Sequence, residues 1–150
     1  MYTRQEASLI RKKFWTSFGQ YMRPVSGAEG DTINWLNYKT GSRHIYFRMD
    51  AGNTNASVAI ELRHPEITAQ EAFYEHLQQF RSLLAETTGE EWNWELHGKD
   101  EDGNTVSRVS KIVEGVNVFN QADWPVIISF LKPRIIALDE FWSTVKDGFI

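Results

Sequence analysis

Apolar residues near the N-terminus recur every three or four positions, which is the spacing of one helix face. The repeat runs through Ala7, Ile10, Phe14, Phe18 and Tyr21. Thr3 followed by Glu6 has the form of a capping box, in which two side chains satisfy free backbone amides at a helix start. Pro24 and Gly27 follow the last apolar residue. The pattern predicts a helix that begins at Thr3 and ends before Pro24.

The next part of the chain alternates apolar and polar residues, with the period of two that is typical of half-buried strands. Three such segments cover 33–38, 43–50 and 55–63, and they are joined by short turns that contain glycine, at 39–42 and 51–54. The pattern predicts an antiparallel meander with one buried face. In its second and third strands we expect the buried side chains to be Ile45, Phe47, Val58 and Ile60.

A second helix and a second pair of strands follow. Thr68 and Glu71 form another capping box, and Gly89 is a natural helix end because glycine tolerates the left-handed backbone found there. Two further segments at 92–96 and 105–113 then have the composition of strands, separated by a polar loop. We expect them to extend the sheet to five strands.

The C-terminal stretch returns to helical spacing. It runs from a cap at Asn120 or Asp123 to Val145, with Pro133 inside the apolar stripe. The element order is then α-βββ-α-ββ-α. We expect residues 1–150 to form a single α+β domain of two layers, in which three helices cover one face of a mostly antiparallel five-stranded sheet.

The composition is that of a globular protein with unevenly distributed charge. The 150 residues include no cysteine, which excludes disulfides and cysteine chemistry. The net charge of -4 disfavours nucleic acid as an unaided partner. Residues 1–64 carry net +4 and residues 65–150 carry net -8. One interpretation is that such a chain pairs with a complementary protein or with a second copy of itself, and the one that we favour is that the two halves lie on different faces and are simply solvated.

The sequence gives no sign of a membrane segment or of a known catalytic motif. No apolar stretch approaches the roughly 18 residues that a membrane span needs, and the N-terminal part lacks the apolar core of an export signal. These features predict a cytoplasmic protein that does not enter a membrane. No phosphate loop, dinucleotide fingerprint, nucleophile elbow or helical histidine pair is present, so we expect no cofactor and no metal, and we favour a non-catalytic role.

The predicted hairpin of 43–50 and 55–63 has one polar face. Its side chains are His44, Tyr46, Arg48, Asp50, Ser57, Glu61 and Arg63. The interpretation that we favour is a solvated strand face with cross-strand charge pairs, among them His44 opposite Glu61. On this interpretation the polar face is solvated and is not a catalytic site.

The alternative is a divergent metal-dependent nuclease. Asp50 followed by Glu61-Leu62-Arg63 is similar to the pattern of an acidic residue and then Glu-x-Lys, in which two carboxylates hold one metal ion. A four-residue turn would place Asp50 opposite Asn55 and Glu61 six residues further along, about 20 Å away at 3.3 Å per residue. This separation, and Arg63 in place of lysine, disfavour a nuclease that uses Asp50, Glu61 and Arg63.

Two tryptophans, Trp15 and Trp124, fall outside the apolar stripes of the predicted helices and strands. A cluster of such residues on the surface would suggest a partner interface, although a second layer of packing is the commoner explanation. Trp15 lies next to the basic run at 11–13. An alternative interpretation is therefore that this part of the chain stacks on the bases of single-stranded nucleic acid. The complete set of binding candidates is His44, Tyr46, Arg48, Trp15 and Trp124.

Several blocks of the sequence together resemble one bacterial family. The blocks are Phe14-Trp15-Thr16, Asn34-Trp35-Leu36-Asn37-Tyr38-Lys39-Thr40-Gly41, Tyr46-Phe47-Arg48-Met49-Asp50, Gly89-Glu90-Glu91-Trp92, Asn117-Val118-Phe119-Asn120, Asp123-Trp124-Pro125 and Leu138-Asp139-Glu140-Phe141-Trp142. Over nearly the whole chain the sequence is similar to the family called domain of unknown function 4268. The family has no assigned activity, and longer relatives place such a domain behind a restriction-nuclease-like region. The resemblance implies a compact accessory module of DNA restriction or defence without the nuclease part.

Overall fold

The computed structural model describes residues 2–150, which form one antiparallel sheet with helices packed against it. Within this range the α-helices are α1 (Arg4–Met22), α2 (Ile67–Gln78), α3 (Arg81–Thr88) and α4 (Trp124–Val145). The strands are β1 (Ile45–Ala51), β2 (Asn55–Leu62), β3 (Asn93–Lys99) and β4 (Thr105–Glu114). Short 3₁₀ helices are η1 (Trp35–Asn37), η2 (Gln121–Asp123) and η3 (Lys146–Gly148). The strand order is β1-β2-β4-β3, and each neighbouring pair is antiparallel.

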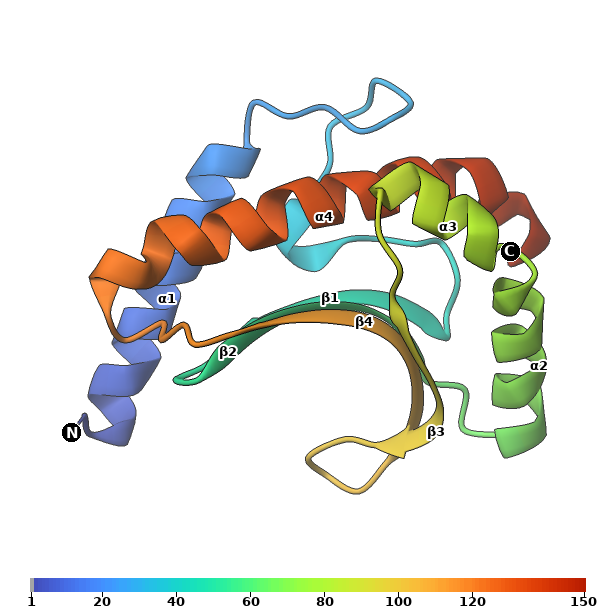
Figure 1. Ribbon diagram of the computed structural model, residues 1–150, viewed down its shortest axis with the longest axis horizontal. Coiled ribbons are helices and arrows are strands. Elements are labelled where there is room, and N and C mark those ends of the chain that lie inside the picture. Colours follow the sequence, from blue (N-terminus) through green and yellow to red (C-terminus); the bar gives the residue numbers. More distant parts are fainter. Residues whose placement is uncertain (1) are drawn as a thin grey trace.

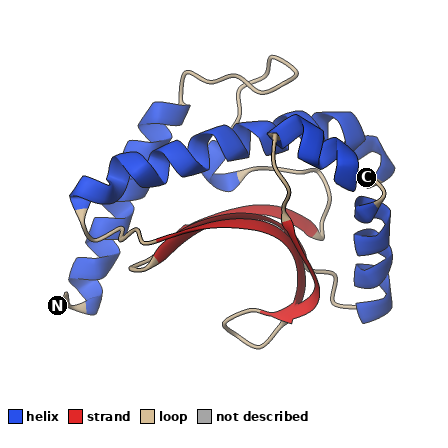
Figure 2. Cartoon of the chain, in the orientation of Figure 1, coloured by secondary structure: helices blue, strands red, loops and turns tan. Residues whose placement is uncertain are grey.

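The helices lie on one side of a curved sheet (Figure 1). The long helix α4 crosses this side, α1 and α3 lie next to it, and α2 stands at one end of the sheet. The other side of the sheet carries no helix from residues 2–150, and only the β3–β4 hairpin curls under it (Figure 2). The predicted two-layer α+β class is therefore confirmed, and one face of the sheet is left open.

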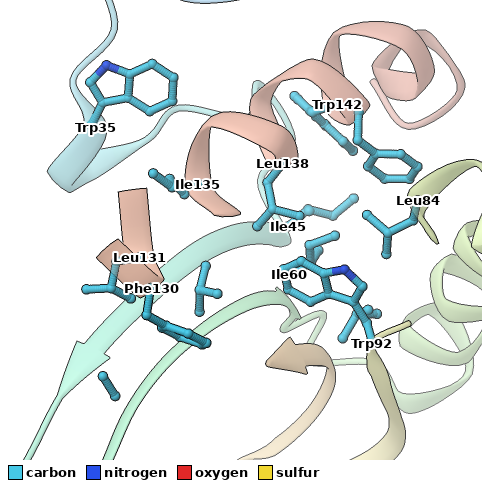
Figure 3. Packing of buried hydrophobic residues seen from close by; sticks show 14 of the residues in the cluster. Trp35, Ile45, Ile60, Leu84, Trp92, Phe130, Leu131, Ile135, Leu138 and Trp142 are labelled. Carbon is cyan, nitrogen blue, oxygen red and sulfur yellow. The ribbon is translucent and has the colours of Figure 1, made fainter. Parts of the chain in front are cut away.

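The hydrophobic core fills the space between α4 and the sheet (Figure 3). Leu138 and Trp142 of α4 lie near Ile45 and Ile60 of the first two strands, and all four are at most 2% exposed. Removal of this apolar surface from water is the main stabilising contribution to the fold. Of the four strand residues predicted to be buried, three are buried, namely Ile45, Val58 and Ile60, and Phe47 is half-buried.

The first helix agrees with its sequence pattern except at Tyr21, which was placed on the apolar stripe but is 57% exposed. The Thr3 side chain accepts a hydrogen bond from the Glu6 amide, and the Glu6 carboxylate accepts one from the Thr3 amide, so the capping box is complete. Phe14, Phe18 and Met22 are buried along the face that packs toward the core. A local cap and a regular apolar stripe agree here, and the helix forms where both predict it.

The segment 33–38 was predicted to be a strand, and this prediction is wrong. The Asn34 side chain accepts a hydrogen bond from the Asn37 amide and starts η1 instead. Trp35 is buried, and its indole N–H donates to the Val25 carbonyl 3.0 Å away. The alternation of apolar residues reflects burial of an irregular segment, so the described sheet has four strands rather than five.

The single helix predicted from Thr68 to Gly89 is instead two helices. The amides of Gln79 and Phe80 bond to carbonyls three residues back, which tightens and ends α2 before α3 begins at a new angle. The second predicted capping box is also wrong, because the cap of α2 is Glu66 and it makes no side-chain capping bond. Gly89, at φ 77°, does end α3 in the left-handed conformation. There are thus four described α-helices rather than three.

The last helix begins at the second of its two predicted caps, because its N-cap is Asp123, although the Asp123 side chain makes no capping hydrogen bond. The Asn120 side chain accepts a hydrogen bond from the Ala122 amide and starts η2, and α4 follows directly from Trp124. Pro133 lies on the exposed side of α4, and the helix continues through it to Val145. A single exposed proline is accommodated because tertiary packing stabilises the rest of a long apolar helix.

Candidate functional site

The register of the β1–β2 hairpin differs from the prediction. Asp50 pairs with Ser57 rather than Asn55, and the hairpin closes with the Gly52 amide bonded to the Asn55 carbonyl. Glu61 consequently pairs with Tyr46, not with His44. Glu61 lies four residues from the partner of Asp50, about 13 Å along the strand rather than the 20 Å expected. The predicted pairing was wrong because the centre of the turn lies one residue later in the chain than the sequence suggested.

The open face of the sheet carries rows of polar side chains that cross all four strands. Residues directly opposite one another in neighbouring strands point to the same face. One such row is Tyr46, Glu61, Arg108 and Glu95. The next row is Arg48, Ala59, Ser110 and Asn93. The predicted polar face of one hairpin is therefore half of a larger polar surface that β3 and β4 complete.

This surface forms a hollow of about 470 Å³. Its lining residues come from the open face of the four strands and from the β3–β4 turn. Figure 1 shows that this face of the sheet lies away from α4. Charged residues dominate its lining, with three arginines against six carboxylates. They are Arg48, Arg63, Arg108, Asp50, Glu61, Glu95, Asp100, Glu101 and Asp102. The formal charge of the lining is thus -3.

Glu61 is the centre of the ion-pair network in the hollow. The residue is only 5% exposed. Its Oε1 accepts a hydrogen bond from Arg63 Nε at 2.8 Å, and its Oε2 accepts one from Arg108 Nε at 3.1 Å. Arg48 Nε lies 3.8 Å from Oε1. A buried carboxylate needs such partners, and here both oxygens of Glu61 are already occupied.

A second carboxylate, Asp100, links the network to the β3–β4 turn. Its Oδ2 accepts a hydrogen bond from Arg63 Nη1 at 2.9 Å, and its Oδ1 accepts from the amides of Asp102 and Asn104. The hydrogen bond from Arg63, together with those from Asn104 and Asp102, lowers the pKa of the Asp100 carboxyl well below its usual range. The loop between β3 and β4 is thus a turn in which backbone amides of the loop donate to the Asp100 carboxylate.

Three acidic residues of the hollow remain without an ionic partner. Asp50, Glu101 and Asp102 are exposed and form no salt bridge with any residue in the range 2–150. The Arg48 side chain is 61% exposed and makes no hydrogen bond with that part of the chain. The hollow therefore presents negative charge together with one available guanidinium group.

The residues of the nuclease alternative all line this hollow. Asp50, Glu61 and Arg63 come from the same hairpin, but Arg63 and Arg108 occupy the oxygens of Glu61. Over residues 2–150, no three His, Asp or Glu side chains gather closely enough to hold a metal ion. Asp50 and Glu61 therefore do not form a convergent pair of metal-binding carboxylates in this structure.

The two tryptophan candidates pack within the aromatic core. Trp15 and Trp124 each meet the ring of Phe14 edge to face, at centroid distances of 4.9 and 5.5 Å. The Trp124 indole N–H donates to the Val118 carbonyl at 2.6 Å. Neither residue lines the hollow. Trp15 lines a separate apolar groove at the edge of the sheet.

Two other candidates lie at the margin of the hairpin face. The His44 ring lies against the His64 ring, with centroids 4.0 Å apart and ring planes tilted by 46°. Partial burial, followed by the neighbouring His64 and Arg43, lowers the pKa of the His44 imidazole. Tyr46 lies in the same row as Glu61, and its hydroxyl donates to the Arg43 carbonyl. Neither residue lines the hollow.

A family model described as "Domain of unknown function (DUF4268)" matches residues 10–146. The chain belongs to this family. Comparison with curated proteins and with solved structures returned no match. All residues that line the hollow of this DUF4268 domain fall inside the matched region. No helix within residues 2–150 combines the length and the apolar character needed to cross a membrane.

Proposed function

We propose that this DUF4268 domain is a non-catalytic binding module that takes a basic segment of a protein partner into the charged hollow. The observation that carries the proposal is the excess of carboxylates on an open sheet face, three arginines against six acidic side chains. A concave surface of one sign of charge attracts a partner of the opposite sign and orients it on approach.

The internal ion pairs explain which charges are available to a partner. Arg63 and Arg108 are engaged by Glu61 and Asp100, so they contribute little free positive potential. Glu101 and Asp102 are exposed and unpaired within the described residues, and they stay free to accept hydrogen bonds from lysine or arginine. These groups favour a cationic partner over a phosphate backbone.

The exposed guanidinium of Arg48 supplies the complementary contact. Arg48 lies on the outermost strand of the hollow and donates to no described group. A protein segment offers backbone carbonyl oxygens between its basic side chains, and a guanidinium group binds such acceptors. A basic peptide therefore satisfies both kinds of group in the hollow, which a simple cation does not.

Binding of a fluorescent peptide of alternating lysine and serine tests this function. We expect the double variant Glu101→Lys with Asp102→Lys to weaken binding by about tenfold or more. The matched control is Glu75→Lys with Glu86→Lys, which makes the same change in net charge on exposed helix positions away from the hollow. Equal weakening by both pairs would show that only overall charge matters and would exclude the hollow as the site.

The nuclease alternative has its own measurement. Wild-type protein and a Glu61→Gln variant are incubated with plasmid and single-stranded DNA in the presence of Mg²⁺ or Mn²⁺. We expect no cleavage by either protein, because both oxygens of Glu61 are bound by arginines. Cleavage by the wild type that is lost in Glu61→Gln would replace the binding module with a metal-dependent enzyme.

A further inference from the structure

Strand β1 is the outer edge of the sheet, and part of its backbone is unpaired. The Gly52 amide bonds to the Asn55 carbonyl, and the Arg63 amide bonds to the His44 carbonyl. In an antiparallel ladder these bonds alternate, so the even-numbered residues of β1 bond toward β2. The N–H and C=O groups of the odd-numbered residues point away from the sheet.

Of the odd-numbered residues of β1, Phe47 and Met49 carry free backbone groups, whereas Ile45 and Ala51 each have one group engaged. The Ile45 carbonyl accepts from the Thr40 hydroxyl, and the Ala51 amide donates to its neighbour Asp50. The N–H and C=O groups of Phe47 and Met49 make no hydrogen bond outward to residues 2–150. A strand edge of this kind is a template for pairing with another strand.

An apolar groove of about 250 Å³ runs along the same edge. Trp15 of α1, Leu36 of η1, and Phe47 and Met49 of β1 line it. Leu36 is 47% exposed although it is a large apolar residue. A strand added at β1 would place its apolar side chains against this groove and its polar side chains beside Arg48.

The sequence of β1 is complementary to itself in one antiparallel register. In Phe47-Arg48-Met49-Asp50-Ala51, a two-fold axis at Met49 sets Met49 against Met49 of the second copy and Phe47 against Ala51. Arg48 then lies opposite Asp50 of the second copy, and Asp50 lies opposite Arg48. The odd-numbered residues meet as hydrogen-bonded pairs, which uses the free backbone groups of Phe47 and Met49 and requires the Ala51 amide to leave the Asp50 carboxylate.

Charge distinguishes this register from its neighbour. A two-fold axis at Arg48 also matches the free backbone groups, but it sets two arginines directly opposite each other, which is destabilising. The axis at Met49 instead forms two opposite-charge pairs, since Arg48 is 61% exposed and Asp50 is exposed. Apolar pairing and the backbone groups allow both registers, and the charges select the axis at Met49.

We propose that a second copy of this chain docks antiparallel on β1, with the two-fold axis at Met49, and extends the sheet across both copies. The contact needs no other molecule, and it shares Arg48 with the peptide contact proposed for the hollow. It uses Arg48 and Asp50 at the outer strand and leaves Glu101 and Asp102 of the hollow free. Two hollows would then lie side by side on one continuous open face.

Light scattering coupled to size exclusion, over a range of protein concentrations without any peptide, tests the docking. We expect the wild type to shift toward twice the monomer mass as concentration rises. Arg48→Glu sets two acidic residues opposite each other, and Asp50→Lys sets two basic residues opposite each other. Each variant alone should weaken association by about tenfold or more and run as a monomer.

Mixing the two variants restores complementary charges at both positions of the pairing. In the mixed pair, the glutamate introduced at position 48 of one copy would face the lysine introduced at position 50 of the other. The native Asp50 and Arg48 that each variant keeps would also face each other, so we expect the equimolar mixture to dimerise.

Arg43→Glu is the matched control, because it makes the same charge change as Arg48→Glu on an exposed residue before β1. This control should leave association intact. A wild type that stays monomeric at every concentration, or two variants that do not associate on mixing, would refute the proposal.

Discussion

The hydroxyl of Tyr38 donates a hydrogen bond to Oδ1 of Asp139, a residue 101 positions further along the chain. The other oxygen of Asp139 accepts from the Ala28 amide at 2.7 Å. One buried carboxylate thus fixes two points of the irregular segment between α1 and β1 onto α4. Burial, followed by the hydrogen bond to Asp139, raises the pKa of the Tyr38 hydroxyl far above its usual value.

Removal of that hydroxyl should weaken the fold. We expect Tyr38→Phe to lower the free energy of unfolding by about 1–3 kcal/mol, because it leaves one oxygen of a buried carboxylate without its donor. Urea denaturation measures the effect. Tyr46→Phe is the control, since that hydroxyl is on an exposed side chain and its loss should change stability by less than about 0.5 kcal/mol. Equal midpoints for the two variants would contradict this account.

The ion-pair network beneath the hollow gives a second prediction. Glu61→Gln leaves Arg63 and Arg108 close together without the carboxylate that neutralises them. We expect a loss of about 2–3 kcal/mol, below the 3–5 kcal/mol typical of fully buried pairs because the arginines are partly exposed. In the control Glu95→Gln, the carboxylate lies 3.6 Å from Arg108 and is half exposed, so little change is expected. Chemical denaturation at neutral pH compares the two.

The contact between His44 and His64 leads to a prediction of how the free energy of unfolding depends on pH. The folded state lowers the pKa of His44, so the folded chain binds a proton there less readily than the unfolded chain does. This contribution to stability is therefore fully present above about pH 6.5 and is lost as the pH falls below that value. His64 and Arg43 are the charged or titratable groups that face His44, and Phe73 of α2 packs beside it.

Replacement of His44 isolates this effect. We expect His44→Gln to reduce the difference in unfolding free energy between about pH 7.5 and about pH 5.5, because the variant has no imidazole to protonate beside His64. Thermal or urea unfolding at the two pH values measures the difference. An unchanged difference in the variant would assign the pH dependence to other groups.

Structural features that depend only on residues close together along the chain were predictable from the sequence. The cap at Thr3, the stripe of α1 and the left-handed end at Gly89 each require only local chemistry, and all three are confirmed. The segment 33–38 shows the limit of this approach. Its alternating pattern records which side chains are buried, but the elements they pack against are α1 and α4, which no local pattern identifies.

The candidate site shows the same limit at longer range. The sequence placed Arg48, Asp50, Glu61 and Arg63 on one face, and the structure confirms this grouping. It missed Arg108, which reaches Glu61 across 47 residues, because strand order cannot be derived from the pattern of either strand. The register was wrong because a shift of the turn centre by one residue changes every cross-strand pair.

The last prediction concerns Phe47, where the core meets the open edge of the sheet. Its ring stacks on Tyr38 at a centroid distance of 4.6 Å and meets Trp142 edge to face at 5.9 Å. Phe47 is half-buried, so we expect Phe47→Ala to cost about 2–3 kcal/mol, below the 3–5 kcal/mol of a fully buried aromatic residue. Phe14→Ala, at a fully buried position in α1, should cost more. Urea denaturation measures both losses, at a low protein concentration that avoids self-association. A larger loss of unfolding free energy for Phe47→Ala than for Phe14→Ala would show that the edge of the sheet, rather than the interior, dominates stability.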